Sequence, residues 1–275
     1  MRSHLYAHIS HLKYLRSTLT SHISHLLKMT KLPSIKILGY DVFSGNEEFF
    51  SDGFKGVVNT ISPHSYIIAR KDPLFREALM ASDFILPDGV GIVMAARVLV
   101  GKKIEKIAGS DLHRVIISAL NEHKGSCFYL GSSDATLQKI RERLSREHPY
   151  VKVGSLSPPY KSVFTNEDSD SMIKAVNEFS PDVLFVGMTA PKQEKWVHEN
   201  RHLLNAPVIC SIGAVFDFYA GTVKRPGKFW ISIGLEWLPR LLREPRRLWR
   251  RTIISTPLFI WFVLLEKLRI KTGKM

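Results

Sequence analysis

The segment DFILPDGVGIVMAARVLVGKKIEKIAGSD, residues 83–111, decides the fold that we expect for this chain. Its apolar residues 84–86 predict a short strand, which Pro87 ends because proline has no backbone N–H to donate within a sheet. Asp88 then lies at the carboxyl end of that strand. Open α/β sheets bind their ligands at this edge, so Asp88 is the first candidate site residue.

Two glycines follow Asp88 and lead into an apolar stretch, residues 93–99, that predicts a buried helix. Gly89 and Gly91 allow a ligand to approach the backbone closely, because glycine has no side chain. Asp88 itself fits two roles. It is a suitable N-cap for a helix that begins near Val90, and it is also suited to act as a general base in a cleft.

The order of apolar strand, small-residue turn and helix recurs along the chain. This alternation predicts an α/β fold, a Rossmann-like and mostly parallel sheet with helices on both faces. The turns between these elements should gather along the carboxyl edge of the sheet and form the site there. We expect strands at about 35–43, 65–69, 84–86, 126–131, 183–187 and 207–211, helices at about 45–60 and 70–80, and a surface loop at 154–170.

Two further turns carry small and polar residues that suit a nucleotide. Ser110 or Asp111 is a good N-cap for the following helix, and Gly109 leaves N–H groups open to a phosphate, although an ordinary capped loop fits equally well. Gly131 and Ser132 could cradle a ribose or a diphosphate. No G-x-G-x-x-G follows any predicted strand, which argues against a dinucleotide-dependent oxidoreductase.

Four blocks in this order resemble the WecG/TagA/CpsF family of bacterial glycosyltransferases, over roughly residues 36–251. They are LPDGVGIVMAARVLVGKKIEKIAGSDL, PDVLFVGMTAPKQEKW, GAVFDFYAGTVKRPGKF and GLEWLPRLLREPRRLWRR. The resemblance implies an inverting transfer of a sugar from a nucleotide-sugar, with UDP as the expected carrier, to a polyprenyl-diphosphate-linked sugar. Such a reaction belongs to cell-surface or exopolysaccharide synthesis and needs no cofactor.

The resemblance also implies roles for individual residues. It favours Asp88 as the general base over Asp88 as a helix cap, and it makes Gln193 a substrate contact, with Glu194 beside it. The alternative for Glu194 is a favourable charge at a helix N-terminus. Lys106 occupies a place where the family prefers arginine, so a bidentate phosphate contact would become a point-charge contact.

The turn NTISPHS is a second place where the resemblance implies polar contacts to substrate. Thr60 matches the family's threonine, whereas Ser62 stands where an asparagine is usual, which would weaken one hydrogen bond. The expected substrate-binding residues of the core are therefore Thr60, Ser62, Gly89, Gly91, Lys106, Gly109, Ser110, Asp111, Gly131, Ser132, Gln193 and Glu194.

The positive charge of the chain, formally +14, lies at its two ends. Residues 1–40 hold six Lys or Arg and no acid, and residues 224–275 hold thirteen against three, whereas the middle holds twenty against twenty-two. A nucleic-acid binder more often carries its positive stripe on the folded body. This distribution favours an anionic membrane surface or a pyrophosphate as partner. A basic nucleic-acid-binding protein and a non-catalytic membrane scaffold are the alternatives.

We expect residues 224–275 to form a basic, amphipathic, helical C-terminal appendage that associates with the membrane. Its apolar run at 253–265 is too short to span a bilayer and suits insertion into the interface. The protein should therefore be cytoplasmic and attached to the inner face of the cell membrane. The arginines expected to reach a phosphate are Arg240, Arg243, Arg247 and Arg250.

Residues 1–30 form the third predicted region, an amphipathic extension ahead of the core at 31–223, and Met29 is an alternative start. The extension holds five histidines, but no cysteine or carboxylate accompanies them, so we expect no metal site. Cys127 and Cys210 lie in apolar runs typical of buried thiols, not of a disulfide framework. The sequence leaves a homo-oligomer open.

Overall fold

The computed structural model describes residues 32–51, 53–223, 227, 230, 237–243, 245 and 249–273. The predicted N-terminal extension, with its histidines and Met29, lies outside these residues, as does Arg247. The chain divides into two units, Met1–Ser34 and Ile35–Met275, and the fold described below is that of the second unit.

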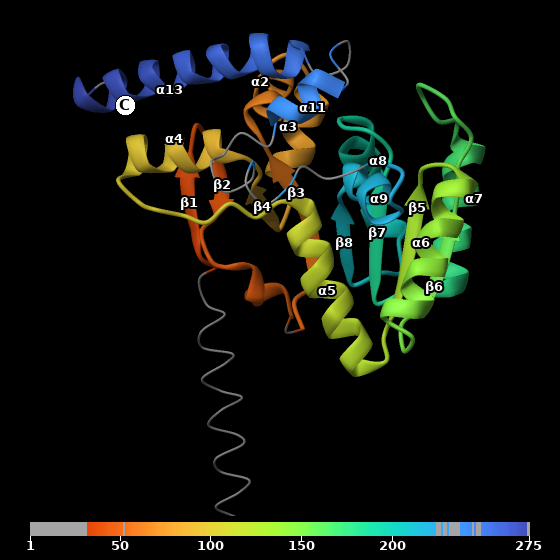
Figure 1. The fold of residues 1–275 in the computed structure, drawn as a ribbon. Helices are drawn as coiled ribbons and strands as arrows, with labels where there is room; N and C mark the ends of the chain where they lie inside the picture. Colours follow the sequence, from red (N-terminus) through yellow and green to blue (C-terminus); the bar gives the residue numbers. More distant parts are fainter. Residues whose placement is uncertain are drawn as a thin grey trace, which may run out of the picture. The chain divides into compact units, whose positions relative to one another are not determined.

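Within the described residues the sheet has eight strands, in the order β1-β2-β4-β3-β8-β7-β5-β6 (Figure 1). Every pair from β2 to β6 across this order is parallel. Only two residues, Leu38 and Gly39, join β1 to β2, and both have positive φ, which is typical of a tight antiparallel hairpin. The predicted α/β fold with a mostly parallel sheet is thus confirmed. The strands are β1 Ser34–Ile37, β2 Tyr40–Phe43, β3 Gly56–Ile61, β4 Phe84–Pro87, β5 Ser126–Gly131, β6 Lys152–Leu156, β7 Val183–Gly187 and β8 Val208–Ser211.

Helices cover both faces of this sheet (Figure 1). Side chains alternate between the faces along each strand, so that Val58 of β3 belongs to one apolar cluster and Val57 to another. The first cluster includes residues of α5, α6 and α9, the second includes residues of α7 and α8, and a third joins α2, α3, α4 and α13 to β2 and β4. The helices are η1 Glu47–Ser51, α2 Pro63–Ala69, α3 Pro73–Met80, α4 Val90–Val100, α5 Gly109–His123, α6 Asp134–Glu147, α7 Asn166–Phe179, α8 Lys192–Asn200, η2 Arg201–Leu203, α9 Gly213–Tyr219, α11 Trp237–Arg243, η3 Arg250–Ile254 and α13 Ser255–Lys271.

Three predicted elements were wrong. The expected helix at 45–60 is a short 3-10 helix followed by strand β3, because the β-branched run of 57–61 favours a strand. The expected strand at 65–69 lies in α2, which starts after Ser62 with Pro63 in its first turn. The expected loop at 154–170 contains the end of β6 and the start of α7.

Helix α4 is only half buried, which corrects the prediction of a fully buried helix. Ile92, Ala96 and Leu99 pack in the core, but Met94 is 61% exposed and Val98 is 38% exposed. The chain therefore presents apolar side chains of α4 to solvent.

The predicted C-terminal helix is present as α13, and it is longer than the apolar run that suggested it. Pro257 lies in its first turn, where proline is tolerated, so the helix continues to Lys271. Phe259 and Val263 are buried against the core, whereas Trp261 is 58% exposed. None of the helices described here is long and apolar enough to cross a bilayer.

Candidate active site

Backbone hydrogen bonds bring Asp88 and the turn after β3 together. Asp88 N donates to Ile61 O at 2.8 Å, and Thr60 pairs with Leu86 across the two strands. Farther along the chain, Ile107 N donates to Pro87 O at 3.1 Å, which holds the backbone next to Lys106 at the same place. Thr60 and Asp88 therefore lie at the adjoining carboxyl ends of β3 and β4, and the backbone beside Lys106 is held there too.

The structure separates Asp88 from the cap of α4. The N-cap position is occupied by Gly89, with φ of 98°, and no side-chain cap is formed there. Asp88 is half buried and precedes that glycine. A general base needs to reach a substrate proton, and a half-buried carboxylate at a strand end meets this requirement.

Ser62 has a structural task in addition to any contact with substrate. Its Oγ accepts from Ser65 N at 3.2 Å, and the Ser65 hydroxyl accepts from Ser62 N at 2.7 Å, which is a reciprocal capping box for α2. The predicted substrate contact of Ser62 stays a prediction.

The N-terminus of α5 joins the site at the end of β8. A Cβ atom on Gly109 would lie 3.0 Å from Ile212 and 3.1 Å from Val215, so only glycine permits this close packing. The predicted N-caps Ser110 and Asp111 were wrong, because Ala108 occupies that position. Asp111 lies in the first turn, and its Oδ2 accepts from Ala108 N at 3.2 Å.

Gln193 and Glu194 occupy the first turn of α8, beside the ends of β7 and β8. Both side chains are buried, and Gln193 Nε2 donates to Glu194 Oε1 at 2.9 Å. Gln193 Oε1 accepts from Met188 N at 3.2 Å, and a Cβ atom on Gly213 would lie 2.6 Å from the same oxygen. Burial raises the pKa of Glu194 to about 7, and the hydrogen bond from Gln193 only partly opposes this shift.

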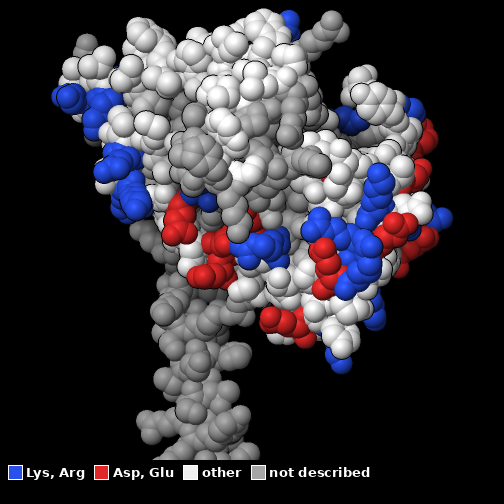
Figure 2. All heavy atoms as spheres, in the orientation of Figure 1, with Lys and Arg blue, Asp and Glu red and all other residues white. Residues whose placement is uncertain are grey.

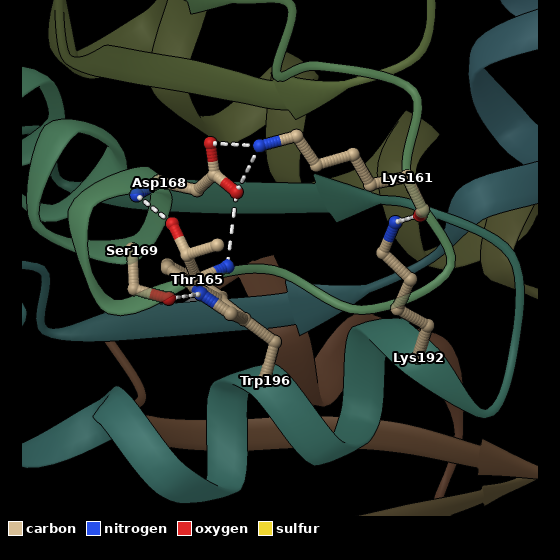
Figure 3. A network of polar contacts seen from close by, with 6 residues as sticks. All are labelled: Lys161, Thr165, Asp168, Ser169, Lys192 and Trp196. Atoms are coloured by element: carbon tan, nitrogen blue, oxygen red, sulfur yellow. Dashed lines mark hydrogen bonds and ion pairs between the residues drawn. The ribbon is translucent and has the colours of Figure 1, made fainter.

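A network of polar contacts fixes α8 against the first turn of α7 and the loop before it (Figure 3). Lys192 Nζ donates to Lys161 O, and Trp196 Nε1 donates to Ser169 Oγ at 3.2 Å. These two residues lie on either side of the Gln193–Glu194 pair in the sequence. The first turn of α8 is therefore anchored at both ends.

The triplet Asp168-Ser169-Asp170 has the letters of a metal-binding motif, but it lies in the first turn of α7. Asp168 accepts from Lys161 Nζ at 2.8 Å and from Thr165 N at 2.9 Å (Figure 3). Its carboxylate thus stabilises the N-terminus of α7 and the preceding loop. Across the described ranges, no group of His, Cys, Asp and Glu side chains is arranged to hold a metal ion.

Gly131 and Ser132 lie at the far end of the carboxyl edge. In the strand order, β5 is four positions from β4, or about 19 Å at the usual spacing of parallel strands. A Cβ atom on Gly131 would lie 2.2 Å from Gly187 O, so this glycine is required by the packing of β5 on β7. The structure does not bring these two residues next to Asp88.

The predicted arginines of the C-terminal segment are only partly described. Arg240 and Arg243 belong to α11, and Arg250 is an exposed residue at the start of η3 with its guanidinium 5.5 Å from the Trp249 ring. Their contact with a phosphate stays a prediction.

Helix α13 packs on α2 and α4, the helices that follow the carboxyl ends of β3 and β4 (Figure 1). His64 Nδ1 lies 2.9 Å from Ser255 Oγ, and the Tyr66 ring contacts Phe259 with centroids 5.4 Å apart. Burial, and then the charge of Arg251, lowers the pKa of His64 to about 4, so its ring is neutral near pH 7. The C-terminal helix thus contacts α2 and α4, the two helices that follow the strand ends carrying Thr60 and Asp88.

This architecture, with polar residues from several turns at one sheet edge, and the relatives described below define the chain as a glycosyltransferase. It belongs to the glycosyl transferase WecG/TagA/CpsF family, whose model matches residues 39–273. The family resemblance found in the sequence is thereby confirmed.

Two curated relatives are similar over most of their length. One, from Bacillus subtilis (strain 168), is 33% identical over 216 residues, which are 78% of this chain and 82% of the relative. The other, from Bacillus spizizenii (strain ATCC 23059 / NRRL B-14472 / W23), is 33% identical over 220 residues, which are 79% of this chain and 82% of the relative. Both are named N-acetylglucosaminyldiphosphoundecaprenol N-acetyl-beta-D-mannosaminyltransferase.

Proposed function

We propose that this chain transfers N-acetylmannosamine from its UDP derivative to a polyprenyl-diphosphate-linked N-acetylglucosamine, with inversion at the anomeric carbon. The names of the two relatives support the two sugars and the lipid-linked acceptor. The observation that carries the mechanism is the position of Asp88, half buried at the end of β4, beside the end of β3 and outside the N-cap of α4.

Asp88 acts as the general base in this reaction. Its carboxylate accepts the proton of an acceptor hydroxyl as that oxygen bonds to the anomeric carbon and the bond from this carbon to the diphosphate oxygen breaks. A single displacement of this kind inverts the centre, and general-base assistance contributes about 10²- to 10⁴-fold in rate. Lys106 and the N-terminus of α5 are the groups of the core suited to stabilise the leaving diphosphate.

A membrane-facing surface accounts for access to a lipid-linked acceptor. Helices α4 and α13 expose apolar side chains in addition to those that they bury, and Lys102, Lys103, Arg269 and Lys271 are exposed at the ends of these helices. Figure 2 shows that the surface at the top, where α13 lies, is mostly white and so carries few charged side chains. Blue atoms of Lys and Arg lie below it at the left. Cations near an anionic leaflet contribute about 1 kcal/mol each, so this surface suits the inner face of the cell membrane.

The test is a transfer assay with the full chain, UDP-N-acetylmannosamine and a lipid-diphosphate-linked N-acetylglucosamine in vesicles. We expect a disaccharide on the lipid and one UDP released per sugar transferred, and no product without the acceptor. UDP-N-acetylglucosamine serves as the matched donor control.

Two outcomes would contradict the proposal. Absence of any nucleotide-sugar binding would favour a membrane scaffold without catalysis. Tight binding to DNA or RNA with a steep dependence on salt, and no transfer, would favour a nucleic-acid-binding protein.

A further inference from the structure

Three buried side-chain atoms form no hydrogen bond with any described residue: Asn59 Oδ1, Glu194 Oε2 and Ser211 Oγ. All three side chains are almost completely buried. Unpaired polar atoms are uncommon in protein interiors, because each one loses its hydrogen bonds to water without replacement. Three such atoms in one domain therefore require an explanation.

Two of these residues are neighbours across β3 and β8. The strands are parallel, with Val57 opposite Ile209 and Val58 opposite Cys210, so the next pair in this register is Asn59 and Ser211. Val57 and Ile209 belong to the cluster under α8, and side chains two residues apart share a face. Asn59 and Ser211 thus lie on the face of the sheet that α8 covers. Their backbones are about 5 Å apart, the spacing of neighbouring strands, and they lie two residues closer to the carboxyl edge than Val57 and Ile209.

Glu194 reaches the same layer from the helix above. Val197 of α8 packs in the cluster with Val57 and Ile209, and Glu194 precedes it by three residues, on the same face of the helix. Because α8 begins at the carboxyl edge, Glu194 is one turn nearer to this edge than Val197. The three unpaired residues therefore form a polar layer between the apolar cluster and the site.

Glu194 is also the group that orients Gln193. One Nε2–H of Gln193 donates to Glu194 Oε1, and the side-chain carbonyl oxygen of Gln193 accepts from Met188 N. These two bonds fix the orientation of the amide group. One N–H of Gln193 is left for a ligand, in a direction set by these two bonds.

We propose that Glu194 is a positioning residue for the transfer, which fixes the Gln193 amide and is itself held by the polar layer of Asn59 and Ser211. This inference rests on the proposed function and on the substrate contact of Gln193 that the family resemblance implies. As the uncharged acid, Glu194 accepts at Oε1 and donates its O–H from Oε2 to Asn59 Oδ1, or through one buried water to Ser211 Oγ.

The surroundings of Glu194 support the uncharged form. Lys195 of α8 pairs with Asp72 at the start of α3, and His198 Nε2 lies 3.9 Å from Glu77 Oε1, so both side chains face α3 and not Glu194. Lys192 donates to the backbone of the loop before α7. Asn59 and Ser211 carry no charge, and burial is the largest cause of the raised pKa of Glu194.

The experiment is a double-mutant cycle in the transfer assay, with Gln193→Ala, Glu194→Ala and the double variant. If Glu194 acts through Gln193, each single variant loses about tenfold to hundredfold in kcat/KM, and the double variant loses no more than the Gln193→Ala variant. Glu194→Gln should restore activity to within about threefold of wild type, because an amide accepts and donates at the same two places. Glu199→Gln, an exposed position of the same helix, is the control.

Two results would overturn the proposal. Additive losses in the cycle would show that Glu194 acts independently of Gln193, and a loss of about 10²-fold or more in Glu194→Gln would assign it to an ionised base instead.

Absence of transfer by the wild-type chain counts against the proposed function, and the polar layer is then tested by stability alone. Since the folded pKa exceeds the usual 4.5, wild-type stability should fall as pH rises from 4.5 to about 7, and Glu194→Gln should lack this fall. The same fall in both proteins would contradict the proposal that Glu194 is uncharged in the folded protein.

Discussion

The β3–β4 half of the carboxyl edge and the β7–β8 half differ, Asn59 of β3 apart, in how far their polar side chains are buried. Asp88 and Lys106 in the first half keep part of their surface in solvent. Gln193, Glu194 and Ser211 in the second half are buried. A group that takes up a proton during turnover needs a partly solvated carboxylate, whereas a group that orients a ligand is better held in a dry, hydrogen-bonded layer. The two halves are thus suited to chemistry and to positioning respectively.

The strongest test of this difference is Asp88→Asn, which keeps the size of the side chain and removes the base. We expect kcat to fall by about 10²-fold or more, with thermal stability and donor binding nearly unchanged, because asparagine keeps the size and the hydrogen-bonding ability of the side chain. Transfer kinetics and a melting curve measure both quantities. Asp134→Asn, an exposed aspartate in the first turn of α6, should have wild-type activity.

A loss of stability in Asp88→Asn, with normal activity per folded molecule, would instead make Asp88 a structural residue. The contrast between the two halves would then be wrong, and the base would have to be sought elsewhere along the edge.

A second test asks whether the membrane serves the β3–β4 half through α13. Trp261→Glu places a charge on the exposed face of α13, and we expect it to weaken binding to vesicles with anionic lipid by about tenfold. Transfer to a vesicle-bound acceptor should fall in parallel, and transfer to a short-chain, water-soluble acceptor should not change.

The matched control is Tyr160→Glu, which charges a fully exposed aromatic residue in the loop between β6 and α7. Equal losses of vesicle binding in the two variants would show that α13 is not the docking surface.

The smallest expected effect concerns the contact of His64 with Ser255, which links α2 to α13. Loss of one hydrogen bond in His64→Ala should destabilise the protein by about 1 kcal/mol, or a few degrees in Tm. The folded pKa of His64 lies near 4, below its usual 6.5, so wild-type stability should decrease as pH falls through this range and the variant should lack that part of the decrease. Melting curves from pH 4 to 7 measure it, and His202→Ala, an exposed histidine, is the control.

The fold could be predicted where a strand and its following turn have strong local signals. Phe84 to Gly91 combines an apolar run with proline and glycine, and the structure has β4 and α4 there. The signal failed at 45–69, because Gly56–Ile61 contains the polar pair Asn59–Thr60 within a buried strand, and SYIIA fits a strand and a helix equally well. Only the pairing of Gly56–Ile61 with β4 and β8 shows that this segment is the strand and that residues 65–69 belong to the helix.

The site could be predicted as a set of turns at one edge, but not as contacts across it. The predictions of Asp88 and Gln193 as site residues come from strand ends and from the family resemblance. The polar layer was missed, because Asn59 and Ser211 are more than 150 residues apart and nothing local indicates that they become neighbours. The same reason hid the contact of His64 with Ser255, which joins two elements at opposite ends of the described core.

Gly91, on the first turn of α4, has a further consequence for how this chain can vary. A single methyl group there would lie 2.5 Å from Pro63 and 3.7 Å from Phe259, so three segments meet with no room for one more carbon. An alanine at this position is tolerated only if Pro63 gives way, and a smaller residue at 63 would in turn alter the first turn of α2. Positions 63, 91 and 259 are therefore expected to change together, as a mechanical fit between the catalytic edge and the C-terminal helix.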